Sequence, residues 1–366
     1  MLKFFKKVVK TIKRIADKKL NFVIFFVTST CNSRCKSCFF WQNLNANNDL
    51  SLDQVEKTSE NLGQFDTLLL SGGEPFLRPD LVQLVNLFVK NNSIKNLGIP
   101  TNTLLGEKII VTVREILNNN KNLNLTINVS LDGLKEDHEY IRGVPGNFDT
   151  AMRLIFLLGE LKKEGFKFNV VINSVICCRN YSSLLDLAAF IKKDFPQIVG
   201  MHVFEIIRGD AKDPLEKKLS ESEVKAIFNK LFEFQSKNYL SILPIWESII
   251  AKASLISKYN LQYKAYCHKA WPVRCNAGQT SAVIYPNGDL AYCELKESLA
   301  NIKDNGFNPV AILQSFGDKI KSRIKKEKCD CTHICFVNEA LWYSFFGIFV
   351  VLPFYYLRYM LTGKIV

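Results

Sequence analysis

The stretch Cys31-Asn32-Ser33-Arg34-Cys35-Lys36-Ser37-Cys38 places three thiols within eight residues. Their sulfurs can meet at one soft metal centre only if the backbone between them forms a loop. A zinc ribbon repeats its two-residue spacing in a second pair of cysteines, and no such pair follows nearby. Three thiolates on a 4Fe-4S cluster leave one iron open to a small molecule. The alternative is a set of structural or zinc-binding cysteines.

Short apolar runs alternate with amphipathic stretches from residue 21 onward, which predicts repeated strand-helix units around a parallel sheet. The expected strands are 22–27, 67–70, 97–101, 123–129, 168–175 and 201–206. The expected helices are 51–62, 79–91, 108–118, 149–163 and 182–193. Six units predict an α/β fold, a partial (β/α)6 barrel of the TIM type. Ligands of such folds gather at the carboxyl ends of the strands.

Candidate ligand-binding residues follow several of these strands directly. Gly72 and Gly73 allow the backbone to approach a ligand closely, and the Glu74 carboxylate beside them can hold a cationic amine. Further candidates at strand ends are Pro75, Asn102, Ser130 and Asp132. A hydroxyl and a carboxylate at the fourth strand end can hydrogen-bond a polar cofactor. For Asp132 the alternative is a simple turn from strand to helix.

The cysteine spacing, together with Gly72-Gly73-Glu74-Pro75 some forty residues later, resembles the radical S-adenosylmethionine (SAM) superfamily. The resemblance implies that the open iron binds the amino and carboxylate groups of SAM. Reductive cleavage then gives methionine and a 5'-deoxyadenosyl radical that removes a hydrogen atom from a substrate. It also implies that Arg142 pairs with the cofactor carboxylate.

One position departs from the superfamily pattern. Its members usually carry an aromatic residue just before the third cysteine, which packs on adenine, and this chain has Ser37 there. Phe39, Phe40 and Trp41 follow directly and are candidates for that stacking role.

A second group of cysteines lies near the carboxyl end of the chain: Cys267, Cys275, Cys293, Cys329, Cys331 and Cys335. Between them, residues 282–285 and 290–292 flank an Asn-Gly turn, which predicts a hairpin. This arrangement resembles the auxiliary-cluster domain called SPASM, or its shortened form, twitch. The resemblance implies one auxiliary 4Fe-4S cluster on Cys275, Cys293, Cys335 and either Cys331 or Cys329, with Cys267 as a substitute. Zinc on the same ligands, with His333 as a further ligand, is the alternative.

Glu294 directly follows one of these cysteines. It is the candidate that would take a proton from a substrate radical, although a surface glutamate is the more ordinary interpretation.

The charge of the chain is unevenly distributed. Eight basic residues and one acidic residue in the first twenty give +7 of the net +13. A nucleic-acid-binding protein would array its basic residues across a folded face, so no nucleic-acid partner is expected. Residues 1–20 instead predict a basic amphipathic helix suited to an anionic membrane surface.

Residues 340–357 carry no charge and are rich in aromatic side chains. They predict a membrane-associating tail, first as an interfacial anchor and second as a single span. A helix packed on the barrel is the alternative.

The expected organisation is a basic helix, a radical SAM core, a helical linker, an auxiliary-cluster domain and a hydrophobic tail, at 1–20, 21–215, 216–264, 265–338 and 339–366. Eleven cysteines, mostly clustered and without a secretory leader, are expected to ligate metal in the cytoplasm. The expected activity is that of an oxidoreductase or maturase on a peptide, a lipid or a lipid-linked glycan. Flavodoxin or ferredoxin would donate electrons at the cytoplasmic face of a membrane. The alternative is a non-catalytic iron-sulfur protein that binds or transfers electrons.

Overall fold

The computed structural model describes residues 19–271, 273–326 and 331–366. The helix predicted near the amino terminus falls on residues 1–18, and Cys329 also lies outside the described residues.

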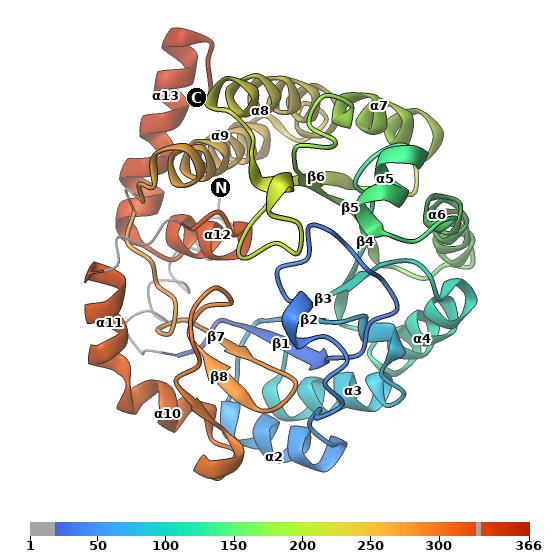
Figure 1. Cartoon of the computed structure of the whole chain (residues 1–366), viewed down its shortest axis with the longest axis vertical. Helices are drawn as coiled ribbons and strands as arrows, with labels where there is room; N and C mark the ends of the chain where they lie inside the picture. The colour runs from blue at the N-terminus through green and yellow to red at the C-terminus, as the bar shows by residue number, and fades with distance from the viewer. Residues whose placement is uncertain (1–18, 272, 327–330) are drawn as a thin grey trace.

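Six parallel strands alternate with helices and confirm the partial barrel (Figure 1). Neighbouring strands pair in the order of the chain, beginning with Phe22 of β1 opposite Thr67 of β2. The strands are β1 (Phe22–Thr28), β2 (Thr67–Gly72), β3 (Asn96–Thr101), β4 (Asn124–Ser130), β5 (Asn169–Ile176) and β6 (Met201–Ile206).

The helices of this half form an outer layer around the strands (Figure 1). They are α2 (Leu52–Leu62), α3 (Leu81–Asn92), α4 (Gly106–Asn119), α5 (Lys135–Arg142), α6 (Asn147–Lys163) and α7 (Leu184–Asp194). The helix α2 begins as predicted at Ser51, whose hydroxyl accepts a hydrogen bond from the Gln54 amide while the Gln54 side chain accepts one from the Ser51 amide.

The carboxy-terminal half extends the same sheet. The predicted hairpin is confirmed as β7 (Ser281–Ile284) and β8 (Asp289–Ala291), which pair antiparallel, and β9 (Ala300–Asn301) follows. Strand β7 also pairs in parallel with β1, so the hairpin extends the barrel sheet to nine strands. The helices here are α8 (Glu221–Gln235), α9 (Ile245–His268), α10 (Pro309–Ser315), α11 (Gly317–Lys326), α12 (Ile334–Trp342) and α13 (Leu352–Thr362).

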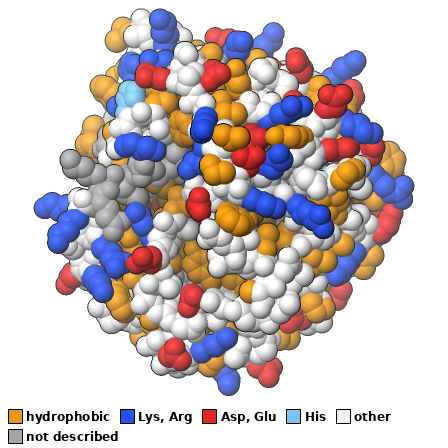
Figure 2. All heavy atoms as spheres, in the orientation of Figure 1, with side chains coloured by type: hydrophobic (Ala, Val, Ile, Leu, Met, Phe, Trp, Pro, Cys, Tyr) orange, Lys and Arg blue, Asp and Glu red, His pale blue; other side chains and the backbone are white. Residues whose placement is uncertain are grey.

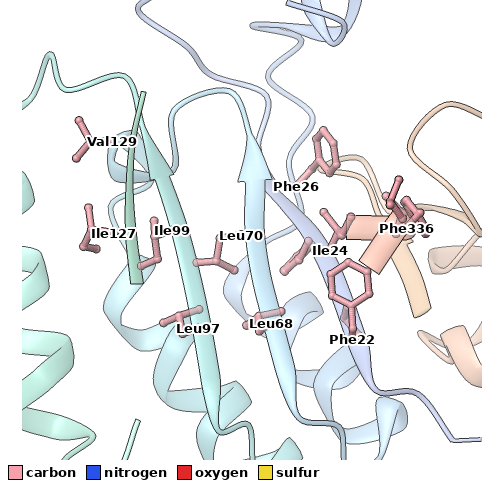
Figure 3. Close-up of a cluster of buried hydrophobic side chains, with 14 of the residues drawn as sticks. Phe22, Ile24, Phe26, Leu68, Leu70, Leu97, Ile99, Ile127, Val129 and Phe336 are labelled. Atoms are coloured by element: carbon pink, nitrogen blue, oxygen red, sulfur yellow. The ribbon is translucent and has the colours of Figure 1, made fainter. Parts of the chain in front are cut away.

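Alternate residues of the first four strands form a buried apolar layer (Figure 3). Its labelled members are Phe22, Ile24, Phe26, Leu68, Leu70, Leu97, Ile99, Ile127 and Val129. Helix α12 covers part of this layer, because the ring of Phe336 lies 6.1 Å from that of Phe22. The tail therefore enters the barrel core at its first helix.

The tail bends sharply after α12. The π-helical turn Gly347–Val351 (η6) joins α13 at an angle of 91° to α12. Within the part of the chain that the structure describes, no single helix has the length and apolar content to cross a membrane. This bent pair meets the requirement by length and composition only.

Candidate active site

A cavity of about 300 Å³ lies at the carboxyl ends of the six parallel strands. Every strand contributes to its lining, with Phe26, Gly72, Thr101, Ser130, Ser174 and Ile206 as one residue from each. Ligand sites of parallel α/β folds occupy this end of the sheet, so the cavity is the candidate active site.

The three clustered cysteines all line this cavity. The Cys35 sulfur lies 3.1 Å from the Ser33 hydroxyl, and the Arg142 guanidinium donates to it at 3.7 Å. Burial raises the pKa of Cys31 and of Cys38 to about 11. Binding of iron at neutral pH must therefore displace protons from these thiols.

The cysteine loop is held against the end of α5. The Arg34 amide donates to the Arg142 carbonyl at 3.2 Å, and the Lys36 amide donates to the Ile141 carbonyl at 2.8 Å. Gly143 ends the helix with φ +66, and a Cβ there would lie 2.9 Å from the Arg34 carbonyl oxygen. Glycine at this position allows the loop and the helix to approach each other.

The glycine pair after β2 is needed for a similar close approach. A Cβ on Gly73 would lie 2.0 Å from the Thr30 carbonyl oxygen, and the Gly73 amide donates to the Thr28 carbonyl at 2.8 Å. Glu74 is buried, and its carboxylate accepts a hydrogen bond of 2.6 Å from the Asn102 amide. Burial raises the pKa of Glu74 to about 7. Since each carboxylate oxygen accepts more than one bond, Glu74 still has acceptor capacity.

Asp132 and Arg142 form a buried ion pair at the same end of the sheet. The Arg142 Nε lies 2.7 Å from an Asp132 oxygen, and the other Asp132 oxygen accepts from the Val175 amide at 2.8 Å. Arg142 lines the cavity and Asp132 does not. The ion pair thus places Asp132 behind Arg142.

The other predicted cofactor residues, Pro75, Asn102 and Ser130, also line the cavity. The Asn102 side-chain amide donates to the Asn32 side chain at 2.7 Å, which ties the end of β3 to the cysteine loop. Phe39 and Phe40 line the cavity as well, whereas Trp41 donates to the Asp210 carbonyl at 3.1 Å and is 36% exposed.

A second polar group, centred on Glu294, also lines the cavity. Glu294 is buried, so the interpretation as a surface glutamate is wrong. Its carboxylate lies 3.2 Å from an Arg208 nitrogen and 2.8 Å from His333 Nε2. Arg208 also pairs with Glu205 at 2.8 Å. Burial alone would raise the pKa of Glu294, but His333 and Arg208 hold it below its ordinary value.

Glu205, Arg208 and His333 were not among the residues predicted for the site. The sequence offers one signal for the first two, because they lie at the end of β6, where a parallel fold places ligand-binding groups. His333 comes from a segment whose position relative to the barrel no local pattern indicates.

The carboxy-terminal cysteines separate into three locations. Cys267, Cys293 and Cys331 line a second cavity of about 480 Å³. Cys335 lines the candidate active site, and Cys275 lines a third cavity. Across residues 19–271, 273–326 and 331–366, no group of three or more His, Cys, Asp or Glu side chains is arranged to hold a metal ion. Ligation by either set of cysteines stays a prediction.

Residues 25–191 match the family model Radical SAM superfamily. This range includes the three clustered cysteines and the candidate residues at the ends of strands β2 to β5. This chain contains a radical SAM domain. Proteins with this domain use a 4Fe-4S cluster and SAM. The residues present fit that pair of groups, since three thiols share one cavity with the largely buried Arg142 guanidinium and with the glycine pair.

Two relatives from Methanosarcina barkeri (strain Fusaro / DSM 804) match beyond this radical SAM domain. Fe-coproporphyrin III synthase is 25% identical over 240 residues, which cover 64% of this chain and 57% of the relative. AdoMet-dependent heme synthase is 22% identical over 337 residues, which cover 88% of this chain and 91% of the relative.

The fold is similar to that of Streptococcus suis SuiB. The structure of SuiB bound to S-adenosylmethionine has a TM-score of 0.57 at 17% identity, covering 90% of this chain and 77% of SuiB. A structure of SuiB bound to precursor peptide SuiA also has a TM-score of 0.57, at 16% identity, with 90% and 75% covered. At this identity the likeness concerns the fold, which supports the partial barrel with its carboxy-terminal extension.

Proposed function

We propose that this chain is a radical SAM enzyme that cleaves SAM reductively and removes a hydrogen atom from a substrate. One observation carries the proposal: Cys31, Cys35, Cys38, the glycine pair and Arg142 line a single cavity at the carboxyl ends of six parallel strands. When bound, the cluster and its cofactor supply one electron and an organic radical.

The roles of the protein groups follow from their positions. Glu74 and the backbone at Gly72 and Gly73, which lines the cavity, receive a cationic amine, while the Arg142 guanidinium receives a carboxylate. Asp132 fixes the orientation of Arg142 through the 2.7 Å ion pair, so we assign it a positioning role in place of direct cofactor contact.

Glu294 is the proposed proton acceptor. Its ion pair with Arg208 and its contact with His333 Nε2 favour the ionised carboxylate, as a proton acceptor must be before it reacts. The lowered pKa makes it a weak base, which suits a substrate radical whose proton is acidic.

We also propose one auxiliary 4Fe-4S cluster. The common cavity of Cys267, Cys293 and Cys331 supports these three residues as ligands more strongly than Cys275 or Cys335, which line other cavities. Four protein ligands would make the cluster an electron relay or a structural element. The alternative is zinc bound by the same residues, and metal analysis of the purified protein distinguishes zinc from iron.

The substrate class rests on the relatives and on the tail. SuiB was solved with a precursor peptide, which supports a peptide or protein substrate. The apolar tail supports a membrane lipid or a lipid-linked glycan as the second candidate. We propose an external donor such as flavodoxin or ferredoxin, and a peripheral position on the cytoplasmic face of a membrane.

The direct test is cleavage of SAM by the purified chain after anaerobic reconstitution with iron and sulfide and reduction with dithionite. We expect 5'-deoxyadenosine at a level at least tenfold above that of Cys35→Ala. Equal amounts from the two proteins would reject the proposal and favour a non-catalytic iron-sulfur protein.

A further inference from the structure

The end of the tail is a helix with two apolar faces. Its inner face is buried and consists of Ile348, Val351, Leu352 and Tyr355. Its outer face consists of eight large hydrophobic side chains, each between 47% and 87% exposed: Phe345, Phe346, Phe349, Val350, Phe354, Leu357, Met360 and Leu361. A helix on the surface of a globular protein normally turns polar residues outward. We call these eight residues the outer tail face.

The inner face is fixed firmly to the rest of the protein. The ring of Tyr359 lies 5.0 Å from that of Phe232 on α8, and Arg358 donates to Asn260 on α9 at 3.3 Å. Before the bend, Trp342 donates to Ser254 on α9 at 3.1 Å. The helix that carries the outer tail face is therefore already packed against α8 and α9 on its other side. Its exposed side chains are not explained by a loosely attached segment.

The arrangement also separates the two arms of the tail. Helix α12 is inside the barrel core, with Phe336 and Val337 at most 1% exposed. The 91° bend then directs η6 and α13 along the surface. Figure 1 places α13 at the upper left edge of the molecule, and Figure 2 shows hydrophobic side chains along that edge. Since α12 is buried in the core, only η6 and α13 lie along the surface, and α12 is not available as one arm of a membrane span.

We infer that the outer tail face binds the interfacial zone of a lipid bilayer with anionic headgroups. Residues 340–366 carry Arg358 and Lys364 and no acidic residue, and the whole chain has a net charge of +13. Phenylalanine and tyrosine side chains are suited to the boundary between headgroups and acyl chains. The sixteen residues of η6 and α13 extend about 24 Å, so the face can lie flat in that zone.

A second copy of this chain is a less favourable partner for the outer tail face than an anionic bilayer. Pairing two outer tail faces would bring together two molecules of charge +13 and place the cations of both tails near one another. Anionic lipid headgroups attract the same cations, at about 1 kcal/mol for each basic residue near the surface. The inference deepens the proposed membrane location and does not depend on the radical chemistry.

Sedimentation with lipid vesicles tests the inference on the full chain. The probes are vesicles of phosphatidylcholine alone and of phosphatidylcholine with a quarter phosphatidylglycerol, at two salt concentrations. The variant is Phe349→Ser with Phe354→Ser, which removes two aromatic rings that are 48% and 57% exposed. The matched control is Val111→Ser with Phe156→Ser, two side chains on α4 and α6 that are 63% and 55% exposed.

We expect wild type and the control to bind the anionic vesicles, and the tail variant to bind at least tenfold more weakly. We also expect binding to weaken with salt. Unchanged binding by the tail variant would overturn the inference, because the basic residues near the amino terminus would then suffice. Absence of vesicle binding, or a dimer that the tail variant alone dissociates, would overturn it as well. Circular dichroism and activity with SAM confirm that each variant is folded.

Discussion

Replacing Glu339 by glutamine should change how the stability of the protein depends on pH. Glu339 lies on α12 and is 3% exposed, and its carboxylate accepts a hydrogen bond from the Thr280 hydroxyl. Burial raises the pKa of this carboxyl from 4.5 to about 7. The unfolded chain therefore loses its proton more readily than the folded chain.

The difference between the folded and unfolded pKa values of Glu339 sets the sign and size of its contribution to stability. Because the folded pKa lies above the unfolded value, the contribution of the protonated carboxyl to stability is fully present below pH 4.5 and is lost as pH rises through about 7. The gap corresponds to about 3 kcal/mol, at about 1.4 kcal/mol for each pH unit. Glutamine keeps the shape and the hydrogen-bond acceptor but has no proton to lose.

Urea unfolding at pH 5 and at pH 8, followed by circular dichroism, measures this effect. We expect the stability of Glu339→Gln relative to wild type to increase by about 2.5 kcal/mol between the two pH values, because a small part of the wild-type contribution is already lost at pH 5. The value at pH 5 serves as the internal control for the substitution itself. Thr280→Val, which removes the donor to the ionised carboxylate, should make the wild-type decline steeper. A difference that stays constant with pH would refute the burial of α12 in the barrel.

Three further predictions concern the site itself. Gly73→Ala should destabilise the fold by about 1–3 kcal/mol, because the new methyl would lie 2.0 Å from a carbonyl oxygen, and it should abolish SAM cleavage. Asp132→Asn should cost about 3 kcal/mol in urea unfolding, since it leaves the buried Arg142 without its anion, and calorimetry should show at least tenfold weaker SAM binding. Replacing Cys293 and Cys331 together by alanine should reduce iron from about eight to about four atoms per chain.

Each of these three predictions has a control variant or a result that would contradict it. Gly317→Ala is the control for the first, because a Cβ at that position would meet no atom within 4 Å and neither Gly317 nor Gly73 has a positive φ. Glu107→Gln removes the anion of an exposed pair with Arg153 and should cost less than about 1 kcal/mol; an equal cost for Asp132→Asn would contradict the buried pair. Iron that stays near eight in the double cysteine variant would assign the auxiliary cluster to other ligands.

Local signals in the sequence predicted most of the barrel. Apolar runs bounded by turn residues located all six parallel strands, and the sixth was predicted at its observed limits, Met201–Ile206. The capping pattern at Ser51 located the start of α2, because a helix cap depends on only four consecutive residues.

Features that depend on distant contacts were not predicted. Helix α5 is short and polar, with only His138 and Ile141 buried, so it has no apolar stripe to reveal it. The pairing of β7 with β1 joins residues about 260 positions apart, and no local pattern specifies it.

The same limit applies to the candidate site. The predicted residues next to strand ends, apart from Asp132, line the cavity, because a parallel sheet brings its strand ends together. The burial of Glu294 depends on Arg208 and His333, which come from two separate segments. Its environment could therefore be described only from the folded chain.

Electron paramagnetic resonance of the reduced, reconstituted protein tests the central claim most directly. We expect a 4Fe-4S signal that requires Cys31, Cys35 and Cys38 and that changes when SAM is added, in a variant lacking Cys293 and Cys331 so that only the first cluster is observed. Zinc at these cysteines, or an iron signal that is the same with and without SAM, would contradict it.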